Sequence, residues 1–452
     1  MLHHLQPRTS IRCTSQPYEM AADSAIPLEK ERHIKYWQRC HKTFLPHQYT
    51  SSDSTRLALI FFILAALDIL SPSSSDRHLL TAEDRAAARN FVLGLQHPAG
   101  GFCGSPTHAL PKDVCAGWDF EKGAPKPRHA SSANIAATYF ALLIFAIVAD
   151  GQEGAKSAYA GVDRVKTLRW LRRLQRADGS FGELVLDDGR IEGGRDMRLC
   201  YLAAATRWML RGDMKEGDVD WVEDIDVDAM VGHIRRSQTY DGGLAESSQL
   251  ESHDLGCAAG YAYCAVSALY LLDRPPSQGA TPHRSVTVEK GLADVELLVK
   301  FLVYRQFDYF EKEEDEEDDP NFVLPDTLGQ LTLDENTRFV GFNGRCNKVA
   351  DTCYCWWVGG TLQMLGHVDL IDEVPSRRFL MSKTQHLIGG FSKYPGGPPD
   401  IYHGYLGLAA LATMGDSTLK PFDASLCATN ETVEKIVVAR QGLDEAAKAR
   451  TA

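Results

Sequence analysis

Residues 174–183 read "LQRADGSFGE", which is a glutamine, a short turn with a glycine, and then an apolar residue. The same pattern occurs in "LQHPAGGFCG" at 95–104, "SQTYDGGLAE" at 237–246 and "TQHLIGGFSK" at 384–393. The stretch "FVGFNGR" at 339–345 is a weaker member without the glutamine. Between the apolar residues that follow the glycines, the spacings are 79, 63, 98 and 49 residues. The shortest spacing approximates one repeat unit, and the longer ones indicate insertions.

Two kinds of helix alternate between these turns. One kind is amphipathic, as in "DRVKTLRWLRRLQ" at 163–175, where leucines recur at helical spacing opposite arginines. The other kind is apolar all round, as in "SANIAATYFALLIFAIVA" at 132–149 and "HGYLGLAALATM" at 403–414, which is typical of interior helices. Outer and inner helices in units of about 50 residues predict an all-α fold of stacked helical hairpins, either an α-solenoid or one closed into a barrel. The inner apolar helices favour closure into an α/α toroid.

The repeat also predicts how the chain is divided. We expect residues 29–416 to form the toroid, with Met20 as an alternative start within the tail that precedes it. Three stretches are rich in proline, polar or acidic residues and are predicted to be surface loops inserted near 105–130, 274–289 and 309–338. The predicted tails are a disordered N-terminal segment at 1–28 and a C-terminal segment at 417–452, in which 431–450 could form a helix.

Composition narrows the class of protein. The chain has 452 residues, of which 44% are apolar and 24% charged, as in ordinary globular proteins. Of the net charge of −12, the run "EKEEDEEDD" at 311–319 contributes −7, as a solvated loop or as an acidic patch that attracts basic substrates. Nothing favours nucleic-acid binding, and the apolar runs are too short for an integral membrane protein. Eleven cysteines without a CxxC pair suggest the reducing cytoplasm.

The stretch "NGRCNKVADTCYCWW" at 343–357 combines residues that could bind a metal ion. Asp351 is a plausible N-cap, and Cys353 then lies in the first helical turn, where the helix dipole favours a thiolate. His403 holds the corresponding position at the start of the next inner helix. One carboxylate, one thiolate and one imidazole leave a fourth position open, as in catalytic zinc sites. The alternative is that Asp351 only caps the helix while Cys353 and His403 pack in the core.

Basic and aromatic residues flank these three. Arg345 and Lys348 precede the cap, and cations near a helix start suit a diphosphate, unless they are only solvent-facing loop charges. Tyr354, Trp356 and Trp357 would line an inner apolar wall, although aromatic residues on inner helices usually form core. A zinc ion, cations and an aromatic wall together suit an isoprenoid diphosphate and a thiol.

The stretch at 343–357, together with "GGRDMRLCYLAA" at 193–204 and "PPDIYHGYLGL" at 398–408, resembles the β subunits of protein prenyltransferases, most closely the type I geranylgeranyltransferases. The resemblance extends from Glu31 to Met414 outside the insertions. It implies an α/α toroid of about six helical hairpins that works as a heterodimer with an α subunit of helical repeats. It also implies a transferase with one Zn²⁺ per β subunit. The expected substrates are geranylgeranyl diphosphate and the cysteine of C-terminal CaaX motifs, of the CaaL type, on Rho-type small GTPases.

The resemblance assigns roles to single residues. It implies that Asp351, Cys353 and His403 are the zinc ligands. It makes Lys393 a catalytic residue, because a lysine here stands where farnesyltransferases carry a magnesium-binding aspartate, so that Mg²⁺ is not expected to be required. The substrate-binding residues that it implies are Arg345, Lys348, Tyr354, His253, Arg198, Ala58 and Trp357.

Some positions in this set bear on specificity. Ala58 replaces a tryptophan that shortens the lipid cavity of farnesyltransferases, and Arg198 corresponds to an arginine near the C-terminus of the bound peptide. His253 matches the family's diphosphate histidine, but "DLGCA" intervenes before the pattern resumes. Asn134 and Leu199 depart from the usual histidine and phenylalanine of the peptide pocket.

Other functions fit parts of this pattern. Within the enzyme class, the rivals are a farnesyltransferase or Rab geranylgeranyltransferase β subunit. Ala58 argues against the first and the long insertions against the second. A terpene cyclase would need an acidic motif on an inner wall, whereas "DEEDD" at 315–319 lies in a hydrophilic stretch. The non-enzyme alternative is a helical-repeat binding scaffold, which would bind no metal.

Overall fold

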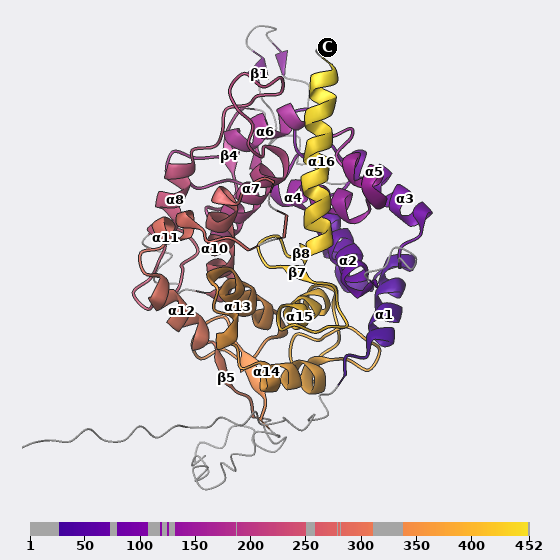
Figure 1. Ribbon diagram of the computed structural model, residues 1–452, viewed down its shortest axis with the longest axis vertical. Helices are drawn as coiled ribbons and strands as arrows, with labels where there is room; N and C mark the ends of the chain where they lie inside the picture. Colours follow the sequence, from indigo (N-terminus) through magenta and orange to yellow (C-terminus); the bar gives the residue numbers. More distant parts are fainter. Residues whose placement is uncertain are drawn as a thin grey trace, which may run out of the picture.

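Six inner helices form a closed ring (Figure 1). They are α2 (Arg56–Leu70), α4 (Ile135–Ile147), α7 (Met197–Leu210), α10 (Ala259–Asp273), α13 (Thr352–Leu365) and α15 (Ile401–Thr413). Each contacts the next in chain order, and α15 contacts α2. The structure is a computed structural model that describes residues 27–72, 79–106, 118–119, 124–125, 132–186, 188–249, 258–277, 279–280, 282–310 and 338–450. Closure of the ring confirms the predicted α/α toroid.

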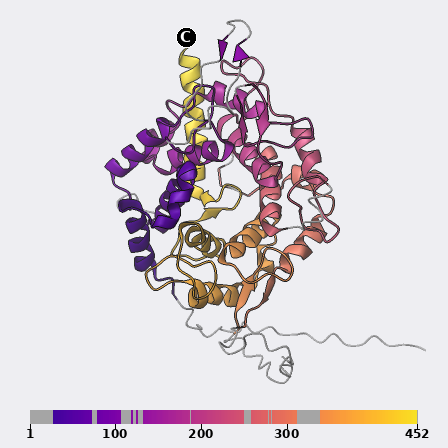
Figure 2. The same cartoon turned by 180° about the vertical axis from the view of Figure 1, so that it is seen from behind.

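Six outer helices surround this ring, as both views show (Figures 1 and 2). They are α1 (Lys30–Lys42), α3 (Ala82–Leu93), α6 (Arg164–Arg173), α8 (Val227–Arg235), α12 (Val295–Val303) and α14 (Glu373–Phe379). In α6 the leucines Leu168 and Leu171 are buried as their spacing predicts. The connections contain the short helices η1 (His47–Thr55), α5 (Gly151–Lys156), α11 (Val286–Gly291), η3 (Val368–Leu370) and η4 (Leu380–Thr384).

The described residues also form four antiparallel strand pairs. They are β1 (Trp118–Asp119) with β2 (Ala124–Pro125), β3 (Leu184–Val185) with β4 (Ile191–Glu192), β5 (Gln306–Asp308) with β6 (Val340–Phe342), and β7 (Phe422–Asp423) with β8 (Ala428–Thr429).

The repeated turns join each hairpin to the next. In the turn after α6, Gln175 forms a β-bridge with Phe181. The Gln175 side chain also accepts from the backbone N–H of Asp226 and donates to its carbonyl, both at 2.7 Å. Because Asp226 caps α8, the glutamine fixes where the next outer helix begins. The last turn makes the same kind of bond to the first outer helix, since the Gln385 side chain accepts from the backbone N–H of Glu29, the cap of α1.

The weak fifth repeat does have its glutamine, contrary to the sequence-based interpretation. Gln306 in β5 pairs with Phe342 in β6 and bonds both the carbonyl of Leu370 and the backbone N–H of Asp372, the cap of α14. The predicted insertion near 309–338 separates the two halves of the motif, so a local pattern search misses it. Residues 311–337, with the acidic run, lie outside the described residues.

Part of the C-terminal segment lies inside the ring. The connection between β7 and β8 lies at the centre of the ring (Figure 1). Hydroxyl groups of three inner-helix tyrosines donate to its carbonyls. Tyr139 bonds Leu426 at 2.8 Å, Tyr263 bonds Ala424 at 2.7 Å, and Tyr405 bonds Cys427 at 2.6 Å.

The segment at 417–452, predicted as a C-terminal tail, also contains a 20-residue helix, α16 (Asn430–Ala449). This helix packs against α4, α5 and α7 and buries Val433 and Ile436. A buried ion pair between Arg274 and Asp423, 2.7 Å apart, ties the segment to the end of α10. These contacts hold the central connection in place.

Candidate functional site

Asp351 caps α13, the role that its position in the sequence predicts. Its carboxylate accepts a hydrogen bond from the backbone N–H of Cys353 at 2.9 Å. The backbone N–H of Thr352 donates to the carbonyl of Lys393 at 2.9 Å, and the Thr352 hydroxyl donates to the carbonyl of Ser392 at 2.7 Å. These two bonds tie the start of α13 to the next glycine turn, and therefore bring Asp351 close to α15.

His403 lies in the first turn of α15, where Asp400 is the cap. One Asp400 carboxylate oxygen accepts from the backbone N–H of His403 at 2.8 Å, and the other lies 2.6 Å from the ring atom Nδ1. A carboxylate can only accept, so Nδ1 carries a proton and a neutral imidazole has its lone pair on Nε2. Nε2 lies 3.3 Å from the Asp351 carboxylate.

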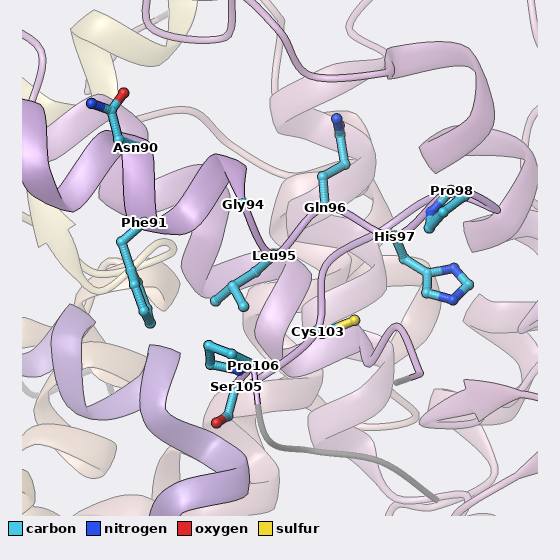
Figure 3. Close-up of a pocket in the computed structure, with 10 residues that line it drawn as sticks. All are labelled: Asn90, Phe91, Gly94, Leu95, Gln96, His97, Pro98, Cys103, Ser105 and Pro106. Atoms are coloured by element: carbon cyan, nitrogen blue, oxygen red, sulfur yellow. The ribbon is translucent and has the colours of Figure 1, made fainter. Parts of the chain in front are cut away.

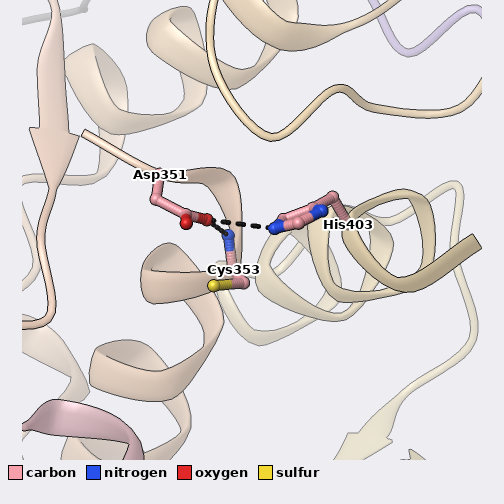
Figure 4. A group of neighbouring side chains, drawn as sticks. All are labelled: Asp351, Cys353 and His403. Atoms are coloured by element: carbon pink, nitrogen blue, oxygen red, sulfur yellow. Dashed lines mark hydrogen bonds and ion pairs between the residues drawn. The ribbon is translucent and has the colours of Figure 1, made fainter. Parts of the chain in front are cut away.

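Asp351, Cys353 and His403 converge in space although fifty residues of chain separate the last two (Figure 4). One ligand atom from each lies within 4.8 Å of the others. Asp351 and Cys353 are buried and His403 is half-buried. In the part of the chain that the structure describes, this is the group of three or more potential metal ligands that meets such a spacing.

Neighbouring groups set the charge of each ligand. Burial alone would raise the pKa of Asp351, but hydrogen bonds from His403 and Cys353 lower it. Burial alone would lower the pKa of His403, but the carboxylates of Asp351 and Asp400 raise it to about 9. Burial, and then the Asp351 carboxylate, raise the pKa of the Cys353 thiol well above its usual value. A thiolate at Cys353 therefore needs an added cation beside it.

The three donors fit a zinc ion. Zinc binds thiolate sulfur at about 2.3 Å and imidazole nitrogen at about 2.0–2.1 Å, so neighbouring ligands of one tetrahedral ion are roughly 3.5 Å apart. The observed spacing needs only small side-chain rotations to reach that value. The Asp400 carboxylate supplies the outer hydrogen bond that orients most metal-binding histidines. Sequence reasoning missed Asp400. It could have been found as an acidic residue three positions before a candidate histidine ligand.

The basic residues expected around a diphosphate lie on both sides of these ligands. Arg345 and Lys348 are exposed on the loop that leads into α13, and Tyr354 lies half-buried in its first turn. The Lys393 ammonium lies 3.8 Å from the Asp351 carboxylate. Burial raises the pKa of Tyr354 to about 12, so its hydroxyl remains a hydrogen-bond donor at neutral pH.

Other predicted residues occupy the starts of neighbouring inner helices. Arg198 lies in the first turn of α7 with its side chain 63% exposed, and it pairs with the α7 cap Asp196 at 2.9 Å. Ala58 is half-buried in the first turn of α2. Asn134 caps α4 through its side chain, and Leu199 is buried. His253 lies outside the described residues.

Aromatic rings form a continuous set beside the triad. Trp357 contacts Tyr263 with ring centres 4.8 Å apart and Tyr402 at 6.4 Å. Tyr402 contacts Phe62 at 5.7 Å, and Phe62 contacts Phe140 at 5.9 Å. Trp357, Phe62 and Phe140 are only half-buried, so this wall is partly open to a ligand. Trp356, by contrast, is fully buried core.

A separate cavity of about 460 Å³ lies between α3 and the first glycine turn (Figure 3). Leu95, Gln96, His97, Cys103 and Pro106 are among the residues that line it. None of the metal-ligand candidates borders it, and the chain beyond Pro106 lies outside the described residues. The converging ligands, rather than this cavity, define the candidate site.

Comparison with known proteins identifies the family to which the chain belongs. Residues 28–428 match the family model described as prenyltransferase alpha-alpha toroid domain. The chain therefore belongs to this family, which its ring of helical hairpins had already indicated.

The relatives specify the branch of that family. The chain is 30% identical over 407 residues to geranylgeranyl transferase type-1 subunit beta of Arabidopsis thaliana, across 87% of each chain. The protein with the same description from Dictyostelium discoideum is 26% identical, across 85% of this chain and 90% of the relative. Protein farnesyltransferase subunit beta of Pyricularia oryzae is 25% identical, across 85% and 63%. The predicted resemblance to type I β subunits is confirmed.

A solved structure agrees with this placement. The Candida albicans protein geranylgeranyltransferase-I complexed with GGPP superposes with a TM-score of 0.66 at 25% identity, over 90% of this chain and 98% of that one. Separately, no helix among the described residues is both long and apolar enough to cross a bilayer.

Proposed function

We propose that this chain is the catalytic β subunit of a type I protein geranylgeranyltransferase. It would transfer the geranylgeranyl group of geranylgeranyl diphosphate to the cysteine of a C-terminal CaaX motif, preferably of the CaaL type, on Rho-type small GTPases. The observation that carries the proposal is the convergence of Asp351, Cys353 and His403 beside an aromatic wall. The names of the type-1 relatives and of the geranylgeranyl diphosphate complex support it.

In this mechanism Asp351, Cys353 and His403 would hold one Zn²⁺. When bound, the zinc ion would lower the pKa of the substrate thiol and present it as a thiolate. Asp400 keeps the proton of His403 on Nδ1, so that Nε2 is available as the ligand atom. Since catalytic zinc sites have three protein ligands, we expect the substrate cysteine to bind beside these three side chains.

The remaining residues act on the isoprenoid diphosphate. Arg345, Lys348 and Tyr354 would bind the diphosphate and stabilise the negative charge that grows on it as the bond to carbon 1 breaks. His253 is the further contact that the resemblance implies. Lys393 would supply at the phosphates the positive charge that other family members obtain from Mg²⁺. Trp357 would bind the lipid chain and exclude water.

The proposal includes two partners, an α subunit and the acceptor peptide. The chain would act as a heterodimer with a prenyltransferase α subunit, as the resemblance implies. Arg198 would bind near the carboxyl terminus of the peptide, although its ion pair with Asp196 must then be shared or released.

We place the reaction in the cytoplasm, because eight cysteines in the described residues are free, as in reducing compartments.

The decisive test compares transfer from fifteen- and twenty-carbon diphosphates to CaaL and CaaS peptides by the complex with its α subunit. We expect the twenty-carbon donor and the CaaL acceptor to be preferred. Ala58→Trp should reduce use of the longer donor by about tenfold or more, since a filled pocket excludes the added length. Ala86→Trp, on the exposed face of α3, is the matched control. Preference for the fifteen-carbon donor by the wild type would instead indicate a farnesyltransferase.

A further inference from the structure

The loop at 344–349 connects β6 to α13 and carries Arg345 and Lys348, the cations proposed to bind the diphosphate. Cys346 lies between them and is exposed. The other free cysteines of the described residues are less accessible, since Cys40 is half-buried and the rest are buried. Cys346 is therefore the thiol of the described chain that a solute reaches most easily, and it lies on the same loop as the two cations without a binding role of its own.

A buried arginine lies directly beneath this thiol. Arg305 is only 5% exposed, and its Nη2 donates to the sulfur of Cys346 at 3.3 Å. Its Nε donates to the carbonyl of Phe301 at 3.2 Å, and the guanidinium lies 4.7 Å from the Phe301 ring centre. Its Nη1 is buried without a hydrogen-bond partner. No ion pair with a carboxylate of the described residues neutralises this guanidinium, which is costly for a buried cation and favours an anionic ligand beside Cys346.

A second unpartnered atom lies under the same loop. The Asn343 side chain donates from Nδ2 to the carbonyl of Lys348 at 3.0 Å, while its Oδ1 is buried without a partner. Arg305 Nη1 and Asn343 Oδ1 are thus two buried polar atoms without a partner beneath the loop that carries Cys346. The class of ligand follows from the exposed cations Arg345 and Lys348 on either side of the thiol, which suit a small peptide with carboxylates.

We propose that Cys346 is a modification site for a small anionic peptide disulfide of the glutathione class, and that its modification blocks the diphosphate site. The Cys346 thiolate attacks one sulfur of the disulfide, so that a new S–S bond forms as the original one breaks. The electron pair leaves with the second peptide as a thiolate, which takes up the proton lost from Cys346. The second peptide is thereby the reduced product.

The consequence depends on the proposed function. A peptide attached to Cys346 places its carboxylates beside Arg345 and Lys348, the cations that the donor diphosphate needs. Like charges cannot both occupy that site, so the two ligands compete. Prenyl transfer therefore falls when the disulfide pool is oxidised and recovers when a thiol reductant removes the peptide.

The test treats the zinc-loaded complex with its α subunit with oxidised glutathione. We expect the mass to rise by one glutathione, peptide mapping to place it on Cys346, and the Kd for geranylgeranyl diphosphate to rise about tenfold or more, the effect of losing one charge-assisted contact. Dithiothreitol should reverse both changes. Cys346→Ser should keep the basal transfer and resist the treatment, and Cys40→Ser should behave as wild type. Arg305→Met should slow the modification.

Two results would overturn the inference. One is an unmodified Cys346 after the glutathione adducts have been mapped, for example to Cys13, Cys115 or Cys257. The other is complete modification of Cys346 with an unchanged Kd for the diphosphate. Mass and mapping need no transferase activity. An untreated complex that transfers no lipid would therefore count against the proposed function, while the modification is still decided separately.

Discussion

Asp400 lies outside the candidate metal-ligand triad and orients one of its members, His403. It caps α15 and accepts the Nδ1 proton of His403, and these two bonds fix both the rotation of the imidazole and its tautomer. Outer-shell carboxylates of this kind typically change metal affinity by about 10–100-fold when they are replaced. The candidate site therefore depends on a fourth residue that binds no metal itself.

Asp400→Asn should weaken zinc binding by about tenfold or more, since the amide keeps the helix cap but is a poorer acceptor for the Nδ1 proton. Competition with a chromophoric chelator measures the zinc affinity of the variant complex. Asp226→Asn is the matched control, because Asp226 caps the outer helix α8 away from the triad. Equal zinc affinities in the two variants would show that Asp400 acts only as a cap.

At the scale of the elements, the glycine turns combine a left-handed backbone with close packing against a neighbouring helix. Gly179 has φ of +90° and packs against the first turn of α8, so that an added Cβ would overlap the carbonyl oxygen of Ala229. Gly189 has a similar φ of +87° with nothing within 4 Å of an added Cβ. Both positions need a left-handed backbone, but only Gly179 lacks space for a side chain.

Gly179→Ala should therefore destabilise the protein by more than Gly189→Ala. The control should cost about 1 kcal/mol for its left-handed backbone, and Gly179→Ala should cost about 1–3 kcal/mol more, because the turn and α8 must separate. Thermal unfolding of both variants measures the difference. If the two midpoints fall equally, the close approach of turn and helix does not contribute to stability.

For the whole molecule, stability depends on the C-terminal segment inside the ring. Arg274 and Asp423 are both almost fully buried, with side chains 1% and 7% exposed. Arg274 also donates to the Ser425 hydroxyl at 2.7 Å. Removing one partner of such a pair leaves an uncompensated buried charge, whereas removing both is often tolerated.

Arg274→Met should lower the free energy of unfolding by about 3–5 kcal/mol, and the double variant with Asp423→Asn should recover part of this loss. A double-mutant cycle in urea measures the coupling between the two side chains. The exposed pair of Arg284 and Glu289 serves as the control, with a coupling of about 0–1 kcal/mol. A coupling for Arg274 and Asp423 no larger than that would contradict the role given to this segment.

The sequence predicts the ring because its signals are local. The glycine turns, the apolar inner helices and the cap at Asp351 can each be recognised within a few residues. Gln306 could not be matched to its turn, because its partner Phe342 is 36 residues away across an insertion. The carbonyls of Ala424, Leu426 and Cys427 could not be predicted either, because backbone atoms that bind distant tyrosines leave no pattern in sequence.

The most direct test of the central claim measures the metal content of the purified complex and geranylgeranyl transfer by the same preparation. We expect about one zinc ion per β subunit in the wild type. We expect both the zinc and the transfer to be lost in Cys353→Ala, while Cys355→Ala, a buried cysteine of α13 outside the triad, should keep its zinc. A Cys353→Ala complex that retains both zinc and lipid transfer would contradict the account.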